Sequence, residues 1–96
     1  MGIDELLKQH RREILSLATR HGARNVRLFG SVARGQARPD SDVDLLVEME
    51  KRRNLLDLVA FWQDVEDLLG RRVDVVSDGG VNPYLRARIL GEAVPL

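Results

Sequence analysis

The chain contains no cysteine and no long apolar run. The lack of cysteine excludes disulfides, zinc sites built on thiolates and cysteine nucleophiles. No apolar run approaches the roughly 18 residues that a membrane-spanning helix needs. The first twelve residues also lack the apolar core and cleavage site of a secretion signal. These absences predict a soluble cytoplasmic protein without a membrane segment.

Neither sign of charge is in excess, because 15 Lys and Arg balance 15 Asp and Glu among the 96 residues. A dedicated nucleic-acid-binding domain typically has an isoelectric point above about 9. The balance therefore argues against direct binding of nucleic acid. The length predicts a single domain over residues 1–96 with one core. It leaves no room for a second domain that would bind a substrate.

The apolar pattern predicts helices and strands in alternation, bounded by glycine and capping residues. Asp4 and Gly22 are predicted to bound the first helix, and Gly91 to end the last one. This order predicts an α/β (α+β) fold with three to four strands. The predicted elements are a helix over 4–21, a strand over 25–29, helical turns over 32–34, a strand over 42–48, a helix over 55–69, a strand over 72–76, a helix over 83–90 and a short edge strand over 93–96.

The strand over 42–48 is predicted to lie at the centre of the sheet. Its alternate residues Val43, Leu45 and Val47 are all apolar and share one face. Leu46 makes the opposite face apolar as well, beyond the two aspartates at the start of the strand. A strand that is buried on both faces is typical of the interior of a sheet.

Gly30 and Ser31 follow the first predicted strand and open a short helix. A turn of this kind presents backbone N–H groups that can hold phosphate. Ser31 adds a hydroxyl donor, and Arg34, one helical turn later, could contact a terminal phosphate oxygen. By itself such a pair after a strand is more often an ordinary turn and helix cap.

Asp42 and Asp44 lie two residues apart at the start of the central strand. Residues with this spacing point to the same face, about 6.6 Å apart along the strand. Two carboxylates in this arrangement can hold hard cations such as Mg²⁺. The alternative is a solvated end of a loop.

Asp74 stands within the apolar run Val73–Val76. An unpaired aspartate is costly in a core, so its face is exposed, or it pairs with Arg71 or Arg72, or it faces Asp42 and Asp44 from a neighbouring strand. In the third case the three carboxylates repel one another, and the pKa of at least one rises in the absence of cations.

Together these pieces resemble a known signature. Ten residues, Val32–Ser41, separate Gly30-Ser31 from Asp42-Val43-Asp44, and Asp74 provides a third acidic position. This pattern is similar to that of the polymerase-β-like nucleotidyltransferase superfamily. The short chain resembles its minimal nucleotidyltransferases, the MntA-type antitoxins of HEPN/MNT toxin–antitoxin pairs. The resemblance implies that superfamily's fold, a small mixed sheet flanked by helices.

The resemblance also implies a role for each residue. Gly30 and Ser31 would hold the β- and γ-phosphates of ATP, the substrate. Asp42 and Asp44 would ligate two Mg²⁺ ions, and Asp74 would join the ion nearer the attacking hydroxyl. The partner would be a HEPN-domain toxin that receives AMP on a tyrosine or a similar hydroxyl.

Two alternatives stay open at this point. The chain could neutralise a partner as a non-catalytic binding module, or transfer a nucleotide to a small-molecule acceptor, working as a homo-oligomer. The sequence decides neither the nucleotide nor the acceptor residue. Outside the motif, His10 and His21 are predicted to be surface or helix-end residues, Phe61 and Trp62 to lie in the core or an interface, and Tyr84 to have a packing role.

Overall fold

The computed structural model describes residues 2–38 and 40–96, and its elements follow the predicted order. Pro39, in the predicted loop over 35–41, lies outside the described residues. The elements are α1 (Ile3–Arg20), β1 (Ala23–Phe29), α2 (Gly30–Ala33), β2 (Val43–Met49), α3 (Leu55–Leu69), β3 (Val73–Ser77), the short 3₁₀ helix η1 (Asp78–Gly80), α4 (Pro83–Glu92) and β4 (Val94–Pro95).

The four strands form one mixed sheet in the order β3-β2-β1-β4. β2 runs antiparallel to β1 and parallel to β3, and β4 pairs with the other edge of β1. The predicted mixed sheet and the interior position of β2 are therefore confirmed. The parallel pair needs a crossover connection, which α3 provides.

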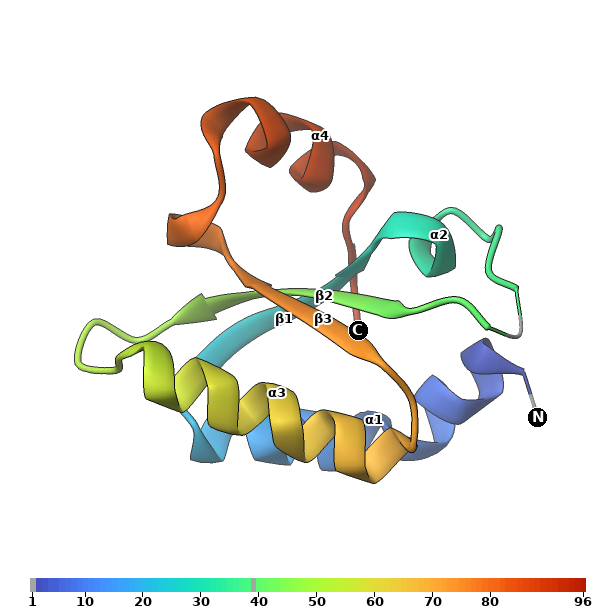
Figure 1. The fold of residues 1–96 in the computed structure, drawn as a ribbon, viewed down its shortest axis with the longest axis horizontal. Helices are drawn as coiled ribbons and strands as arrows, with labels where there is room; N and C mark the ends of the chain where they lie inside the picture. The colour runs from blue at the N-terminus through green and yellow to red at the C-terminus, as the bar shows by residue number, and fades with distance from the viewer. Residues whose placement is uncertain (1, 39) are drawn as a thin grey trace.

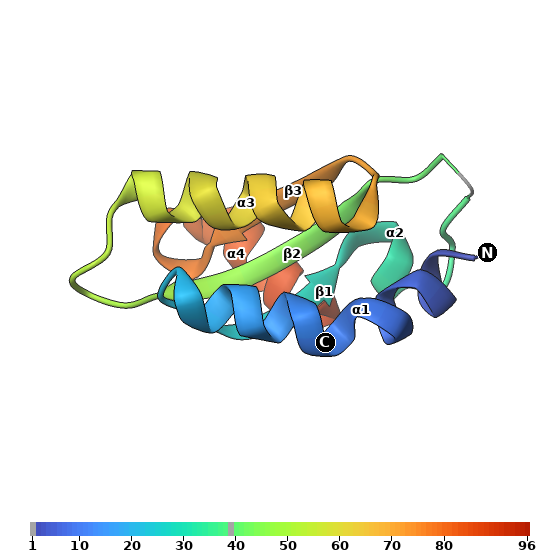
Figure 2. The same ribbon diagram turned by 90° about the horizontal axis from the view of Figure 1, so that it is seen from below.

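The helices cover the two faces of the sheet unequally (Figure 1). α1 and α3 lie side by side on one face, as Figure 2 shows from below, whereas α4 lies on the opposite face. α2 is a short turn at the end of β1. The main core lies between the sheet and α1 with α3, and it contains Ile3, Leu7, Ile14, Ala18, Ala23, Val26, Val32, Val43, Leu45, Val47, Phe61, Val65, Leu69, Val73 and Val75.

The alternation along β2 explains its position. Val43, Leu45 and Val47 are fully buried toward α1 and α3. Leu46 is also buried, on the opposite face, although it does not belong to the main core. β2 is therefore covered on both faces beyond Asp44, as the sequence predicts, while Asp44 itself is only half-buried.

The ends of three helices differ from their predicted positions, and the first of them is α2, which covers Gly30–Ala33 instead of 32–34. α1 begins after Gly2, so Asp4 lies in its first turn instead of capping it. A carboxylate in that turn still interacts favourably with the helix dipole. Gly91 does not end α4, which continues to Glu92. Gly91 has no positive φ, and a glycine in ordinary helical geometry weakens a helix without ending it.

The remaining predictions for single residues have mixed outcomes. Phe61 is fully buried, and the half-buried Trp62 donates its indole N–H to the carbonyl of Val73, so both belong to the packed interior. His21 caps the end of α1 and contacts Asp64. The packing role predicted for Tyr84 is wrong, because this side chain is 92% exposed. No helix in the described part of the chain is long and apolar enough to cross a membrane.

Candidate active site

Gly30 connects β1 directly to α2 with a left-handed backbone conformation, φ +75°. A Cβ atom at this position would overlap the Oδ2 atom of Asp44. Glycine is therefore required for two reasons, the positive φ and the close approach of the backbone to a carboxylate. The approach places the phosphate-type turn and the acidic strand side by side.

The parallel pairing of β2 and β3 brings Asp74 next to Asp44. The two residues are direct partners in the register, and Phe29, which precedes the Gly30 turn, faces Asp44 from β1. Asp42 lies two residues before Asp44 and is exposed. Of the three interpretations of Asp74, the structure combines two, because its side chain is exposed and also faces Asp44.

The surroundings of Asp44 oppose its negative charge. Burial is the largest cause, followed by the charges of Asp74 and Asp42, and together they raise the pKa of Asp44 to about 6. The same value of about 6 includes two smaller effects, a lowering of the pKa by Arg34 and a slight raising by Glu92. The mutual repulsion predicted for the three carboxylates is therefore present, and it acts mainly on Asp44.

The carboxylates of Asp42, Asp44 and Asp74 match the preference of Mg²⁺ for oxygen ligands. Within residues 2–38 and 40–96, no three acidic or histidine side chains are gathered tightly enough to surround an ion. The aspartates nevertheless share one end of the sheet, and a cation there would relieve the repulsion that raises the pKa of Asp44. The chemistry of the site therefore fits a divalent metal, although the three carboxylates are spaced more widely than the ligands of a single ion.

Ser31 and Arg34 lie on or beside the same short helix as Gly30. Ser31 is half-buried in the first turn of α2, and its carbonyl accepts the N–H of Gln36. The guanidinium of Arg34 is close enough to Asp44 to affect its pKa. Gly30, Arg34, Asp42 and Asp74 therefore all approach Asp44, by contact, strand register or charge, and Ser31 follows Gly30 in α2.

Glu92 also belongs to this junction, and the sequence reasoning did not find it. Its Oε1 atom accepts the N–H of Gly30 at 2.9 Å, and its Oε2 atom lies 3.1 Å from Nη1 of Arg34. These contacts hold the pKa of Glu92 below its usual range. No local signal pointed to it, because the sequence predicts a helix end at Leu90 and leaves Glu92 outside any predicted element.

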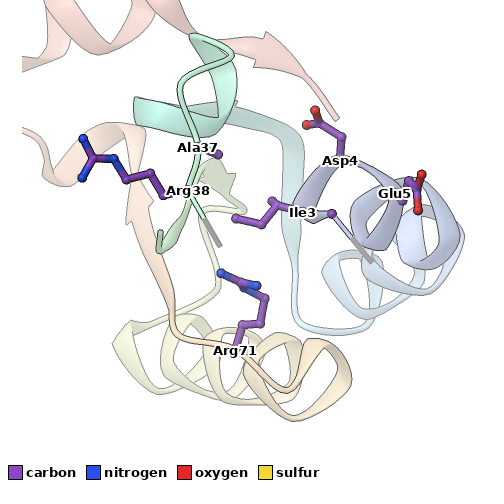
Figure 3. A pocket seen from close by; sticks show the side chains of 7 residues that line it. Ile3, Asp4, Glu5, Ala37, Arg38 and Arg71 are labelled. Carbon is purple, nitrogen blue, oxygen red and sulfur yellow. The ribbon is translucent and has the colours of Figure 1, made fainter. Parts of the chain in front are cut away.

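A separate pocket of about 390 Å³ opens beside the site. The first residues of α1 line it together with Ala37, Arg38 and Arg71. Figure 3 shows Ile3 and Arg71 directed toward one another across it, and Arg71 also donates to the carbonyl of Ser41. None of the six predicted site residues lines this pocket, so the acidic cluster is a distinct feature of the molecule.

Known sequences agree with this geometry. The profile of the nucleotidyltransferase domain family matches residues 7–95. The chain is 38% identical over 92 residues to protein adenylyltransferase MntA of Thermococcus cleftensis, and the match covers 96% of the chain and 90% of that relative. It is 39% identical over 94 residues to MJ0435 of Methanocaldococcus jannaschii, a candidate protein adenylyltransferase, with 98% and 97% covered.

Solved structures agree as well. A candidate minimal nucleotidyltransferase superposes with a TM-score of 0.87 at 55% identity, covering 96% of this chain and 94% of the other. A toxin–antitoxin structure with AMP-PNP superposes with a TM-score of 0.76 at 20% identity, which shows a common fold, over 88% of this chain and 69% of the other. The chain therefore belongs to the nucleotidyltransferase domain family and is a minimal nucleotidyltransferase.

Proposed function

We propose that this chain is a protein adenylyltransferase that uses Mg²⁺ to transfer AMP from ATP to a hydroxyl of a partner HEPN toxin, and that it thereby acts as the antitoxin. One observation carries the proposal: the register places Asp74 beside Asp44, and Gly30 brings a phosphate-type turn against the same carboxylate. A triphosphate with bound cations needs both a turn that binds its phosphates and carboxylates that hold the cations. The names of the relatives, protein adenylyltransferases, support the choice of reaction.

The chain's own residues would position the donor nucleotide. The N–H groups of the Gly30 turn and the hydroxyl of Ser31 would bind the β- and γ-phosphates, and Arg34 would add a charged donor. The contacts of Glu92 support this role, because Gly30 and Arg34 together already bind one carboxylate. Groups that bind one anion in this way are suited to another.

The aspartates would hold the cations. Asp42 and Asp44 would ligate two Mg²⁺ ions, and Asp74 would join the ion nearer the acceptor. That ion would lower the pKa of the acceptor hydroxyl, and the other ion would neutralise the pyrophosphate. The half-buried position of Asp44 supports this role, since a carboxylate with a raised pKa gains most from a nearby cation.

The reaction that suits this arrangement is an in-line displacement at the α-phosphate. The acceptor oxygen, a tyrosine hydroxyl in our proposal, gives its proton to solvent water and forms a bond to the α-phosphorus. The bond from that phosphorus to the bridging oxygen breaks, and pyrophosphate leaves with the electron pair. AMP remains on the acceptor as a phosphodiester.

The acceptor hydroxyl is proposed to arrive on another protein. All the described elements are used for the sheet, its covering helices and the donor half of the site. The acidic end of the sheet is open, because Asp42 and Asp74 are both exposed. A macromolecular acceptor can dock against such a surface, whereas a small molecule would need an enclosed pocket.

A transfer assay tests this proposal. The chain is incubated with ATP labelled at the α-phosphate, Mg²⁺ and a candidate partner, a HEPN-domain protein. We expect label on the partner, and we expect the variant with both Asp42→Ala and Asp44→Ala to lose at least about 99% of it. A hundredfold loss is modest for the removal of metal ligands from a two-metal site. The variant Asp67→Ala, at an exposed aspartate on α3, is the matched control and keeps its transfer rate.

Two results would contradict the proposal. A tight complex with the HEPN protein and no label on either chain would identify a binding module that acts without catalysis. Label that appears only on an added small-molecule acceptor would identify a transferase of a different substrate class. Mass spectrometry of the labelled partner then identifies the acceptor residue by the added mass of AMP.

A further inference from the structure

The carboxylate of Glu92 occupies two of the donors that the proposed function assigns to phosphate, the N–H of Gly30 and Nη1 of Arg34. It accepts the N–H of Gly30 at 2.9 Å, and both of its oxygens lie within 3.3 Å of Nη1 of Arg34. Its side chain is 23% exposed, so this arrangement is neither deeply buried nor freely solvated. A carboxylate and a phosphate oxygen compete for the same N–H group, because each donor holds one acceptor in good geometry.

Local forces do not explain a glutamate at this position. Glu92 is the last residue of α4, where the helix dipole disfavours negative charge. Arg88, one turn earlier, offsets part of this effect and helps to lower the pKa of Glu92. The strongest partners of the carboxylate are nevertheless tertiary, at the α2 turn, far from α4 in the sequence. The contact between α4 and α2 therefore holds the glutamate in place.

The segment that carries Glu92 is weakly attached to the rest of the fold. None of the ten residues of α4, all of them described, is buried. The following strand β4 pairs with β1 at Val94 and Pro95, and the firmer attachment of the segment comes after it, where Leu96 donates its N–H to the carbonyl of Val26 and packs against the core. A helix with so few buried contacts opens at a low free-energy cost. A rotation of the Glu92 side chain alone would also release Gly30 and Arg34.

We propose that Glu92 sets the affinity for the nucleoside triphosphate by acting as an internal competitor for the phosphate-binding groups Gly30 and Arg34. This inference rests on the proposed function, since it assumes that the phosphates bind there. Triphosphate binding displaces the Glu92 carboxylate and uncouples α4 from α2. The phosphates and Glu92 cannot share the donors, because two anions at that distance also repel each other.

Isothermal titration calorimetry with AMP-PNP and Mg²⁺ tests this inference on the full chain. If the Glu92 contact is closed for about nine-tenths of the time, it weakens the apparent affinity about tenfold. The variant Glu92→Gln loses the charged contact, so we expect it to bind AMP-PNP about tenfold more tightly than the parent chain. Inorganic tripolyphosphate with Mg²⁺ gives the same gain, since the competition concerns phosphates and not the base.

Two further variants separate the contact from general effects. Glu92→Asp keeps the charge but is one methylene shorter, so it no longer reaches Gly30 and also binds AMP-PNP more tightly. Asp57→Asn is the matched control, because the Asp57 carboxylate likewise accepts a backbone N–H, that of Asn54, at 3.0 Å and pairs with an arginine, Arg53, at the start of α3 and outside the site. Its affinity for AMP-PNP stays unchanged.

The outcomes distinguish this inference from the function on which it rests. If the parent chain binds AMP-PNP and neither Glu92 variant binds more tightly, the competition is overturned and the proposed function stands. Weaker binding by Glu92→Gln would instead show that Glu92 orients Arg34 toward the nucleotide, which also overturns the competition. If neither the parent chain nor the variants bind AMP-PNP or tripolyphosphate, both proposals fail.

Discussion

Asp44 is a paired residue of the sheet and also carries a charge, and these two roles conflict in the absence of a cation. Its backbone pairs with Phe29 on one side and Asp74 on the other, so the residue is part of the sheet. Its carboxylate is half-buried beside other negative charges, which raises its pKa to about 6. Selection for stability alone would not keep a half-buried carboxylate next to other negative charges. Destabilising charges of this kind are concentrated at functional sites.

The charge on Asp44 makes stability depend on pH. The folded protein holds the proton more tightly than the unfolded chain, since the pKa is raised from 3.8 to about 6. The stability that this proton contributes is fully present below about pH 4 and is lost as pH rises through 6. Asp44→Asn removes the charge, so without divalent metal it is more stable than the parent chain at pH 7.5 by about 1 kcal/mol, after a discount for solvent screening.

Urea unfolding in the presence of EDTA at pH 7.5 and pH 4 measures this difference. The advantage of Asp44→Asn disappears at pH 4, where the parent chain is protonated as well. Asp67→Asn, on the exposed face of α3, has no advantage at either pH. An equal gain for Asp44→Asn at both pH values would show that packing, and not charge, is responsible.

Among the helices, α3 has the most complete local signals. Its cap, Asn54, accepts the N–H groups of Leu56 and Asp57, and the carboxylate of Asp57 accepts the N–H of Asn54. Gly70 ends the helix with a positive φ. The bounds of α3 are the ones that the sequence predicts, because both ends depend on residues within or next to the segment itself.

Loss of this cap tests its contribution. Asn54→Ala leaves two N–H groups of the first turn without their side-chain acceptor, so we expect a loss of about 1 kcal/mol of unfolding free energy. Urea unfolding at pH 7.5 measures it. Gln63→Ala, at an exposed position in the middle of α3, is the control and changes stability by less than about 0.5 kcal/mol. Equal losses in both variants would refute the capping role.

The two ends of α4 illustrate where such local signals are insufficient. Asn82 caps its start and Pro83 follows at the first helical position, a pair that is typical of a helix N-terminus. The sequence predicts its end at Leu90, yet the helix continues to Glu92. The extension coincides with the contacts of Glu92 to Gly30 and Arg34, which belong to another part of the chain. A tertiary interaction thus overrides the local stop signal of Gly91.

At the scale of the whole molecule, the site is a junction of elements from both halves of the chain. A ligand that joins the turn after β1 to the acids on β2 and β3 therefore stabilises the entire fold. Binding to the native state adds about 2.7 kcal/mol of stability when the ligand is at about a hundred times its Kd. We expect ATP with Mg²⁺ to raise the melting temperature of the chain by several degrees.

Thermal unfolding with and without ATP and Mg²⁺ measures this shift. Gly30→Ala places a methyl group against Asp44 and strains a positive φ, so its melting temperature no longer responds to the ligand. Gly79→Ala is the matched control, because a Cβ at Gly79 meets open space and φ is not in the left-handed region. A shift of equal size in both variants would place the nucleotide elsewhere on the protein.

The local parts of this site follow from residues that are neighbours in the chain. They are the Gly30-Ser31 turn, the spacing of Asp42 and Asp44, and the two apolar faces of β2. Backbone geometry and the burial of apolar faces are sufficient to predict them from the sequence. Asp74 also stands out locally, as an aspartate within an apolar run, but the residues alone leave three interpretations open, and the family resemblance favours the one in which it joins Asp42 and Asp44.

Which of these parts meet depends on the tertiary structure. The parallel register of β2 and β3 places Asp74 beside Asp44, and the packing of α4 brings Glu92 to Gly30. Neither contact has a local cause, because the partners are separated by 30 and 62 positions in the chain. Their proximity depends on which apolar faces are buried together, and that choice is made by the whole core and not by any single segment.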